Sequence, residues 1–452
     1  DTGLWVKPGN TFVLIAGNLR FVGGVITAET GKIELGAVNS GFVGIDNNIR
    51  GWEFDYSGIE NFGDIQLTEK SLADVSCVGS GFVEVRGQNL LMSDGSVLWT
   101  QNLGDAVSGD INVNVSESLL VEGRSPDKII RTAIFADALA GKGGNVTLNG
   151  KRVTAPGGAN IGTYSYGEYQ AGNISVNASE LVEVNNSAIN PFTQTAIGTN
   201  TFGKGNAGDN IISTRQLIIT GAGSIASATL GKGNAGNINI RADYIEVSGV
   251  NIDNNRNSSI TATTITQGTA GNLKIDTNSI IVKDGGAVSA PTLSTGNGGN
   301  ITINASEFIE VNGTGSGKLF PSVISTSSNV TDEITRKLFN LPQLPSGNPG
   351  SIIINTPILR VFNDGLINVK NVAARKNSGR IEVNANSIIL NNQGGITAAT
   401  VSGSGGNIQL NTNNLQINNG IINASTSGIG NGGDININAT ESVEVNGGGF
   451  DK

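Results

Sequence analysis

Histidine is absent from this chain of 452 residues. Its absence excludes Ser-His-Asp and Cys-His catalysis, HExxH metal sites and any zinc site with a histidine ligand. Cysteine occurs once, so Cys77 has no partner for an internal disulfide, and we interpret it as a small core or turn residue rather than a nucleophile. Charged residues make up only 14% of the chain and aromatic residues 5%. A coiled coil, which needs abundant Ala, Glu, Lys, Leu and Arg, is therefore excluded.

The sequence lacks the features expected of a protein that binds nucleic acid, membranes or nucleotide phosphates. The net charge is −9 and Lys and Arg form no cluster, so we predict no binding to nucleic acid. No apolar run approaches the roughly 18 residues of a membrane span, so we expect no membrane insertion. The Gly-Lys pairs lack the Ser or Thr that completes a phosphate-binding loop; they end at Lys32, Lys142, Lys204, Lys232 and Lys318. No cofactor is predicted.

Glycine, by contrast, is abundant, with 65 residues arranged in a repeat. The phrase "GNGGNITINASEFIEVNG" at 296–313 returns as "GNGGDININATESVEVNG" at 430–447. Such units open at Gly109, Gly144, Gly172, Gly208, Gly236, Gly271, Gly299, Gly350, Gly379, Gly406 and Gly433. The shorter units have 27 to 29 residues, and a fixed period of this length indicates a solenoid. Because the first residue is not Met and the last unit breaks off, we expect the chain to be an internal part of a longer protein.

Each unit contains three short segments in which apolar and polar residues alternate. The first follows the opening glycine, as at Ile301 and Ile303; the second contains pairs such as Leu359 and Val361. The third has the form "ITATT" from Ile260. A period of two is typical of strands with one buried face. We therefore predict an all-β fold, a parallel β-helix of about 27–29 residues per rung with corner insertions, in which Gly and Asn supply left-handed corner conformations.

The expected solenoid is continuous but changes along its length. Residues 1–108 are predicted to form less regular N-terminal rungs, and residues 109–452 to form the regular repeats. Alternate units carry extra residues between the second and third strands; these inserts are at 123–131, 185–195, 249–258 and 312–321. Because they leave the same corner on every second rung, we expect a fringe along one side.

A further excursion at 329–349 is the predicted recognition element. Thr331 matches a helix N-cap and Pro342 a stop, so a short helix is expected between them. Its candidate contact residues are Asp332, Glu333, Arg336, Lys337 and Phe339. The alternative, that the excursion only shields an open edge or packs on the side of the solenoid, stays open.

Three patterns of polar residues are candidates for chemical sites. Residues that end the first strand of their units are expected to stack as a structural ladder, with a sugar-binding or metal-binding row as the alternative; they are Asn304, Asn384, Asn411 and Asn438. Carboxylates follow three opening glycines, but the nine-residue period of calcium-binding repeats is missing; they are Asp110, Asp209 and Asp434. A repeated outward position favours a solvated face; it holds Glu183, Glu310 and Glu444. No catalytic and no metal-binding residue is predicted.

Two phrases, "VLIAGNLRFVGGVITAETGKIELGAV" and "IILNNQGGITAATVSGSGGNIQLNTNNLQINNGIINASTSGIGNGGDININA", resemble cyanobacterial filamentous-haemagglutinin-like exoproteins. The resemblance extends over essentially the whole chain and implies a right-handed parallel β-helix. It also implies export by a two-partner system through an outer-membrane β-barrel transporter, and a role as a secreted or cell-surface adhesin or filament shaft. Its ligand would be a cell-surface glycan or protein.

The resemblance fails at one motif. The family's secretion domain carries Asn-Pro-Asn-Gly-type motifs, which neither Asn190-Pro191 nor Asn348-Pro349 matches. The implied contact with the transporter would therefore lie in a missing N-terminal domain.

A carbohydrate-active β-helix enzyme, either a polysaccharide lyase or a hydrolase, is the alternative function. Such an enzyme places several carboxylates and a basic residue in one groove. A shaft is expected to spread its charge over the rungs. The acidic residues are scattered along this sequence, which favours the shaft.

Overall fold

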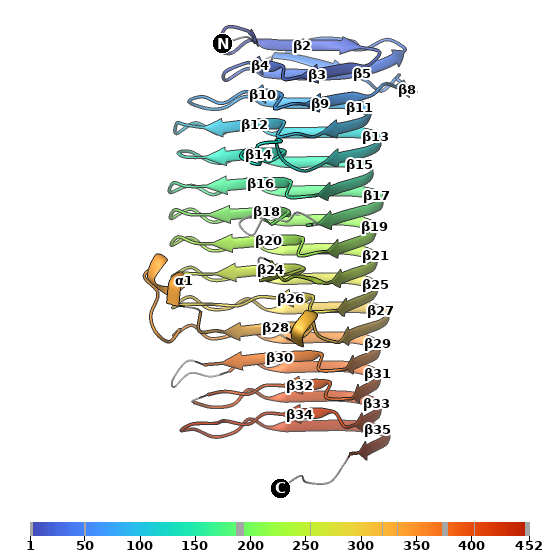
Figure 1. The fold of residues 1–452 in the computed structure, drawn as a ribbon, viewed down its shortest axis with the longest axis vertical. Helices are drawn as coiled ribbons and strands as arrows, with labels where there is room; N and C mark the ends of the chain where they lie inside the picture. Colours follow the sequence, from blue (N-terminus) through green and yellow to red (C-terminus); the bar gives the residue numbers. More distant parts are fainter. Residues whose placement is uncertain are drawn as a thin grey trace.

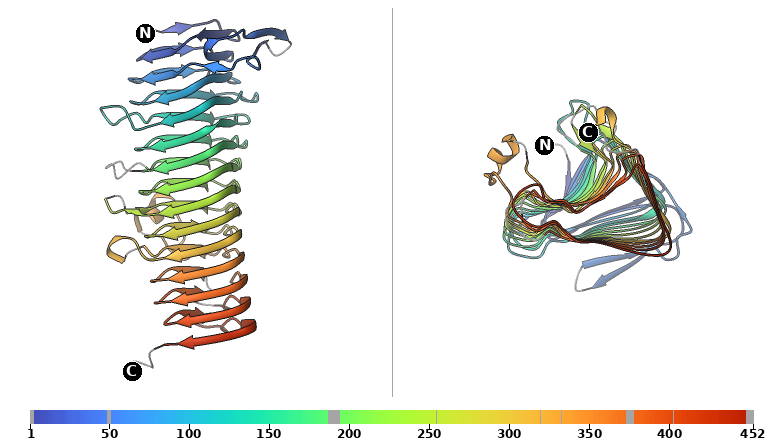
Figure 2. Two further views of the ribbon diagram at one scale, coloured as in Figure 1. Left: turned by 90° about the vertical axis from the view of Figure 1, so that its right-hand side faces the viewer. Right: turned by 90° about the horizontal axis from the view of Figure 1, so that it is seen from below.

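The computed structural model describes residues 3–48, 51–186, 194–253, 255–318, 320–331, 333–372, 378–401 and 403–447. Strands dominate, and they stack as the rungs of a long parallel β-helix (Figure 1). The all-β solenoid predicted from the repeat is thereby confirmed. Seen along the axis, successive rungs superimpose closely (Figure 2).

Two parallel sheets form the walls of the helix. The sheet of short strands contains, in stacking order, β1 (Leu4–Trp5), β4 (Val25–Thr27), β10 (Leu72–Asp74), β12 (Val97–Asn102), β14 (Ala133–Ala138), β16 (Asn160–Ser165), β18 (Ala196–Thr201), β20 (Ser224–Thr229), β24 (Ser259–Thr264), β26 (Ala287–Ser289), β28 (Val323–Ser328), β30 (Leu366–Asn371), β32 (Gly395–Thr397) and β34 (Ile421–Asn423). The second sheet contains β2 (Thr11–Ala16), β3 (Leu19–Val22), β5 (Lys32–Ser40), β9 (Ile65–Thr68), β11 (Phe82–Met92), β13 (Ile111–Val121), β15 (Val146–Pro156), β17 (Ile174–Asn185), β19 (Asn210–Thr220), β21 (Ile238–Ser248), β25 (Leu273–Lys283), β27 (Ile301–Asn312), β29 (Ile352–Phe362), β31 (Ile381–Asn391), β33 (Ile408–Asn418) and β35 (Ile435–Asn446).

A few elements lie outside the two walls. Near the N-terminus, β6 (Gly44–Asn48) and β7 (Gly51–Asp55) form an antiparallel hairpin, and β8 (Asn61–Phe62) pairs antiparallel with β5. A second hairpin joins β22 (Val250–Asn251) to β23 (Arg256–Asn257). The helical elements are the 3-10 turn η1 (Ser316–Lys318) and the helix α1 (Glu333–Leu338).

Each regular rung has one long strand and one short strand, rather than the three separate strands that we predicted. The first two predicted segments are the two halves of one long strand. In β27, for example, the pairing register with β29 shifts between Asn304 and Phe308, and pairing continues on both sides. An irregularity of this kind bends a strand while keeping it in the sheet. The predicted corner between the first two segments is therefore a bend within a strand.

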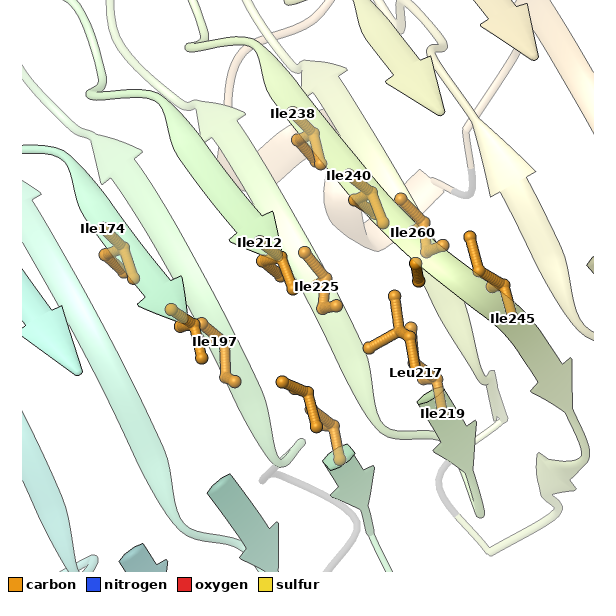
Figure 3. Close-up of a cluster of buried hydrophobic side chains, with 14 of the residues drawn as sticks. Ile174, Ile197, Ile212, Leu217, Ile219, Ile225, Ile238, Ile240, Ile245 and Ile260 are labelled. Atoms are coloured by element: carbon orange, nitrogen blue, oxygen red, sulfur yellow. The ribbon is translucent and has the colours of Figure 1, made fainter. Parts of the chain in front are cut away.

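The interior is a stack of aliphatic side chains. Ile301 and Ile303 are fully buried and lie in register with Ile352 and Ile354 of the next rung. Figure 3 shows the same arrangement further up the solenoid, where Ile238 and its neighbours from several rungs fill the space between the two walls. Each such side chain contributes about 1.5–3 kcal/mol on burial. Because neighbouring rungs supply that burial, a rung is stable only within the stack.

The glycine that opens each regular unit is required by a close approach and not, as we expected, by a left-handed backbone. A Cβ atom on Gly236 would lie 1.8 Å from the carbonyl oxygen of Gly208 on the preceding rung. Gly271 would meet the carbonyl oxygen of Gly236 at the same distance. None of these three glycines has a positive φ. Only glycine therefore lets this corner stack at the strand spacing of about 4.8 Å.

Left-handed residues occupy the other corner, between the long and the short strand. Asn363 and Asp364 have φ values of 51° and 66° after β29, and Asn392 has 48° after β31. Asparagine and aspartate adopt this conformation more readily than other side-chain-bearing residues. The predicted corner role of asparagine is thus fulfilled at this corner, while the opening glycines serve another purpose.

Gly236→Ala is expected to destabilise the solenoid by more than about 1–3 kcal/mol, because the added methyl group overlaps backbone that has no free space. Thermal unfolding followed by circular dichroism measures this effect. Gly58→Ala is the matched control, since a Cβ atom at Gly58 meets nothing within 4 Å. Equal melting temperatures for the two variants would contradict the close-approach account.

Ile303→Asp is expected to disrupt folding far more than Thr302→Asp. The first places a carboxylate in the apolar interior, where an unpaired charge is very costly, whereas Thr302 faces outward. Melting temperatures and expression yields of the two variants provide the comparison. If both variants melted together, the inward and outward assignment of β27 would be wrong.

Candidate binding surfaces

Asparagine side chains form a hydrogen-bonded ladder along the outer face of the long strands. The Nδ2 of Asn355 donates to Oδ1 of Asn304 (2.8 Å), and Asn384 donates to Asn355 in the same way (2.9 Å). Asn411 donates to Asn384 (2.7 Å) and Asn438 to Asn411 (3.0 Å). The four asparagines singled out in the sequence therefore lie on one stack. Because their amides bond to one another, the arrangement fits a structural role.

The aspartates of the calcium hypothesis take part in a second ladder, at the opening corner. Oδ1 of Asp110 accepts the backbone N–H of Asn145 (2.7 Å), and Oδ1 of Asp209 accepts that of Asn237 (2.7 Å). The backbone N–H of Asp434 donates to a side chain of the preceding rung. In the part of the chain that the structure describes, no three Cys, Asp or Glu side chains gather to hold a metal ion.

An outward column on the second half of the long strands keeps its carboxylates apart. Glu183, Glu246 and Glu310 lie in one register, with Ile218 and Ile281 on the rungs between them. Like charges that lie directly opposite on neighbouring strands destabilise a sheet. The alternation avoids that repulsion, as expected of a solvated face.

The inserts project from one side of the solenoid, as their described parts show in Figure 2. In the insert 249–258, Arg256 donates to the side chain of Gln194 (3.2 Å), which belongs to the insert 185–195 two rungs away. Most of that second insert, residues 187–193, lies outside the described residues. The contact shows that inserts on alternate rungs touch across the rung between them.

The excursion contains the predicted short helix, α1. The side chains of Glu333 and Lys337 form an ion pair with each other (2.7 Å) at the surface. Ile334 and Leu338 are 80% and 74% exposed, so this face of the helix does not pack on the solenoid. Shielding of an open edge therefore does not account for the outer face of α1.

The other candidate residues of the excursion are placed differently. Asp332 lies outside the described residues, and Arg336 is half-buried on α1. Phe339, directly after the helix, lines a groove of about 740 Å³ between the excursion and the turns of preceding rungs. Figure 1 shows α1 beside the rungs of β24 and β26. We call this hollow the excursion groove; it is lined by 339–342, 202–204, 230–232, 266–267 and 294–295.

The excursion groove combines apolar and basic side chains. Phe202 and Leu230 line it together with Phe339, and Lys204 and Lys232 stand at equivalent positions of adjacent rungs. Lys204 forms an ion pair with Glu168, which lies outside the lining, so Lys232 is the lysine that leaves its charge to the groove. Among its described lining residues there is no carboxylate. The groove therefore complements a ligand that has an apolar part and a negative charge.

A second hollow, of about 370 Å³, lies between the β6–β7 hairpin and the outer face of β5 and β11. We call it the hairpin pocket; its lining is Lys32, Glu34, Trp52, Glu53, Phe54, Phe82, Glu84, Arg86, Asp110 and Asn112. Four carboxylates and two cationic side chains that are scattered along the sequence share this one pocket. Glu34 and Glu84 are distant in the sequence and become neighbours only through the register of β5 and β11.

The carboxylates at the floor of the hairpin pocket are held by hydrogen bonds. Glu34 is 2% exposed; its Oε1 accepts the Tyr56 hydroxyl (2.9 Å) and its Oε2 pairs with Nζ of Lys32 (2.8 Å). Glu84 accepts Nδ2 of Asn112 (2.7 Å). Burial raises the pKa of Glu84, and the Asn112 hydrogen bond opposes that shift. Both side chains are fixed before any ligand arrives.

An aromatic cluster on the outer side of the short-strand sheet adjoins a buried carboxylate. The rings of Phe135 and Tyr164 are 5.6 Å apart, and Phe202 is 6.4 Å from Tyr164. Oδ2 of the buried Asp137 accepts Nε1–H of Trp99 (3.2 Å), while its Oδ1 has no partner among the described residues. Burial raises the pKa of Asp137 to about 6. These residues lie on or beside the short strands of the stack, but their side chains do not recur from rung to rung, so periodicity could not reveal them.

Comparisons with models of protein families, with curated proteins and with solved structures found no match for the chain. Among the residues that the structure describes, no helix is long and apolar enough to cross a membrane. The likeness to haemagglutinin-like exoproteins accordingly stays a prediction from the sequence phrases.

Asp137 is expected to make stability depend on pH. Its folded pKa of about 6 lies above the ordinary 3.8, so its favourable contribution is complete below about pH 4 and is lost as pH rises through 6. At pH 7.5 the loss amounts to about 3 kcal/mol at most. Asp137→Asn should therefore melt above the wild type at pH 7.5 and close to it at pH 4.

The control for this experiment is Asp253→Asn, an exposed aspartate in the β22–β23 hairpin. Its melting temperature should follow that of the wild type at both pH values. A wild-type and an Asp137→Asn protein with parallel pH profiles would show that the Asp137 carboxyl is not destabilised by burial.

Proposed function

We propose that this chain is the shaft of a secreted or cell-surface exoprotein, structural and binding rather than catalytic. The observation that carries the proposal is the unbroken stack of rungs, from which a helix-bearing excursion departs and leaves a groove at its base. The repeated surfaces are occupied by their own ladders of amides. Binding is thereby left to the places where the repeat is interrupted.

Export through an outer-membrane β-barrel transporter of a two-partner system belongs to the same proposal. Its support is the resemblance of the sequence phrases to haemagglutinin-like exoproteins. A long parallel β-helix also suits passage as an extended chain, because each rung folds onto the one before it. The adhesive ligand in this proposal is a cell-surface glycan or protein.

The excursion groove is the proposed adhesive surface. Phe339 provides apolar contact from the excursion, and Lys232 provides positive charge from the turns of the preceding rungs. A glycan or protein segment with an acidic group matches this lining. Ile334 and Leu338 on α1 extend the apolar surface beyond the groove.

A carbohydrate-active enzyme is the second candidate, and the hairpin pocket favours it. The pocket gathers carboxylates and cations in one hollow, which is the arrangement that glycoside-cleaving enzymes need. The shaft remains the better-supported proposal because both oxygens of Glu34 are already engaged by Tyr56 and Lys32.

A glycan and protein array, combined with a polysaccharide-degradation screen, separates the two functions. The shaft proposal expects binding without degradation, and it expects Phe339→Ala to weaken binding at least about tenfold, or 1.4 kcal/mol. Leu344→Ala, an exposed residue of the same excursion that lies outside both the groove lining and α1, is the matched control.

The enzyme proposal predicts degradation of the polysaccharide. It expects degradation that Glu84→Gln abolishes and that Glu183→Gln, on a repeated outward position, leaves unchanged. That result would overturn the shaft-only assignment. Binding that survives Phe339→Ala undiminished would remove the excursion groove as the adhesive surface.

A further inference from the structure

We infer that the hairpin pocket is a binding site for a saccharide that carries a free amine. The pocket lies on the N-terminal rungs, away from the excursion groove, and the inference is independent of the proposed adhesive surface. Four features carry it, namely aromatic side chains in the lining, a polar floor, an excess of carboxylates and a lysine whose ammonium group is already held there by a carboxylate and an aromatic ring.

The walls of the pocket are aromatic in a chain with few aromatic residues. Trp52 reaches in from the hairpin and Phe82 stands on β11, and each is 47% exposed. Half-exposed aromatic rings that line a hollow offer flat apolar contact area. The C–H face of a pyranose ring is a ligand surface that suits such contact.

The floor consists of planar hydrogen-bonding groups from adjacent rungs. Glu34, Glu84 and Asn112 lie in one register on β5, β11 and β13. Arg86 stands on the same face, 3.7 Å from the carboxylate of Glu84. Both oxygens of the buried Glu34 are engaged by Tyr56 and Lys32, so the groups left for neighbouring hydroxyl groups of a sugar are the Glu84 carboxylate, the Asn112 amide and the Arg86 guanidinium.

A close contact between Gly36 and Tyr56 positions the floor of the pocket. A Cβ atom on Gly36 would lie 2.5 Å from the hydroxyl oxygen of Tyr56, so glycine alone lets Tyr56 reach Glu34. The stacked pair of Glu34 and Glu84 also departs from the alternation of Glu and Ile seen further along the solenoid. Two like charges on adjacent rungs are destabilising unless other groups compensate them.

The charge of the pocket selects the ligand. Its described lining has four carboxylates but only two cations. Lys32 pairs with Glu34 and Arg86 lies beside Glu84, whereas Glu53 and Asp110 have no ion-pair partner among the described residues. A uronate would be repelled, and an ammonium group would be attracted.

Lys32 illustrates how an ammonium group is held here. Its Nζ lies 5.3 Å from the centre of the Phe54 ring, bonds the backbone carbonyl of Trp52 (3.4 Å) and pairs with Glu34. A cation above an aromatic face beside a carboxylate is a favourable arrangement. Phe82 and Asp110 bring a second aromatic ring and a second carboxylate to the lining, and we place the ligand amine at these two residues.

Isothermal titration calorimetry of the whole chain with three oligosaccharides tests the inference. The probes are a glucosamine oligomer at a pH that keeps its amines protonated, an N-acetylglucosamine oligomer and an oligogalacturonate. The expected order of affinity is glucosamine, then N-acetylglucosamine, with the uronate weakest. Trp52→Ala and Asp110→Asn should each weaken the glucosamine oligomer at least about tenfold.

Matched controls distinguish the pocket from general charge and surface effects. Asp209→Asn changes the same ladder position as Asp110→Asn but lies outside the pocket, and Phe42→Ala removes a 95% exposed aromatic side chain that does not line it. Neither control should alter binding. Circular dichroism spectra identical to the wild type should accompany all four variants.

Three outcomes would overturn the inference. These are the absence of binding to any of the three probes, tightest binding of the oligogalacturonate, and equal weakening by Asp110→Asn and Asp209→Asn. Cleavage of the oligomer would replace a binding site by a catalytic one. Phe339→Ala should leave the titration unchanged, so failure of the adhesive groove and failure of this pocket are separable.

Discussion

The contact between glycines at the opening corner is the constraint on which the rest of the solenoid depends. The carbonyl oxygen of each opening glycine occupies the space where the next rung would place a Cβ atom, as Gly208 does toward Gly236. This contact fixes the spacing and register of successive rungs at one point per turn. The interior isoleucines of the first half of the long strand and the asparagine ladder then stack because their distances from that glycine are the same in every unit. The outward column in the second half stacks because register shifts, such as the one between Ala178 and Leu181, realign strands of unequal length.

Periodicity in the sequence was enough to predict the parts of the fold that repeat. The inward direction of Ile301 and Ile303 and the stack through Asn304 both follow from fixed positions after the opening glycine. The predicted number of strands per rung was wrong. An alternating pattern that is interrupted by two residues does not distinguish a bend within one strand from a corner between two strands. The reason for the glycines was also wrong, because close approach and positive φ select the same residue.

The candidate sites could not be predicted to the same extent. The short helix of the excursion was expected from its capping residues, but the path that carries Phe339 back over the turn at Phe202 depends on three-dimensional packing. The hairpin pocket was missed altogether, since the residues that meet there, such as Trp52 and Glu84, belong to irregular rungs without a common period. The sequence repeat therefore predicts the stacked strands but not the positions of the pockets between them and the irregular segments.

Stacking also limits where a charged site can exist in such a fold. Every side chain on the outer face has a neighbour on the next rung at strand spacing, so a repeated carboxylate would stack on its own copy. The column through Glu246 avoids this by placing Ile218 and Ile281 on either side. Glu34 and Glu84 do stack, and the structure offsets their repulsion with Lys32, Arg86, Tyr56 and a hairpin that covers them. A repeat protein tolerates such a departure only where local groups outside the repeat stabilise it. The hairpin pocket meets that condition, because the β6–β7 hairpin and the residues after it bring Trp52, Phe54 and Tyr56 to the stacked carboxylates.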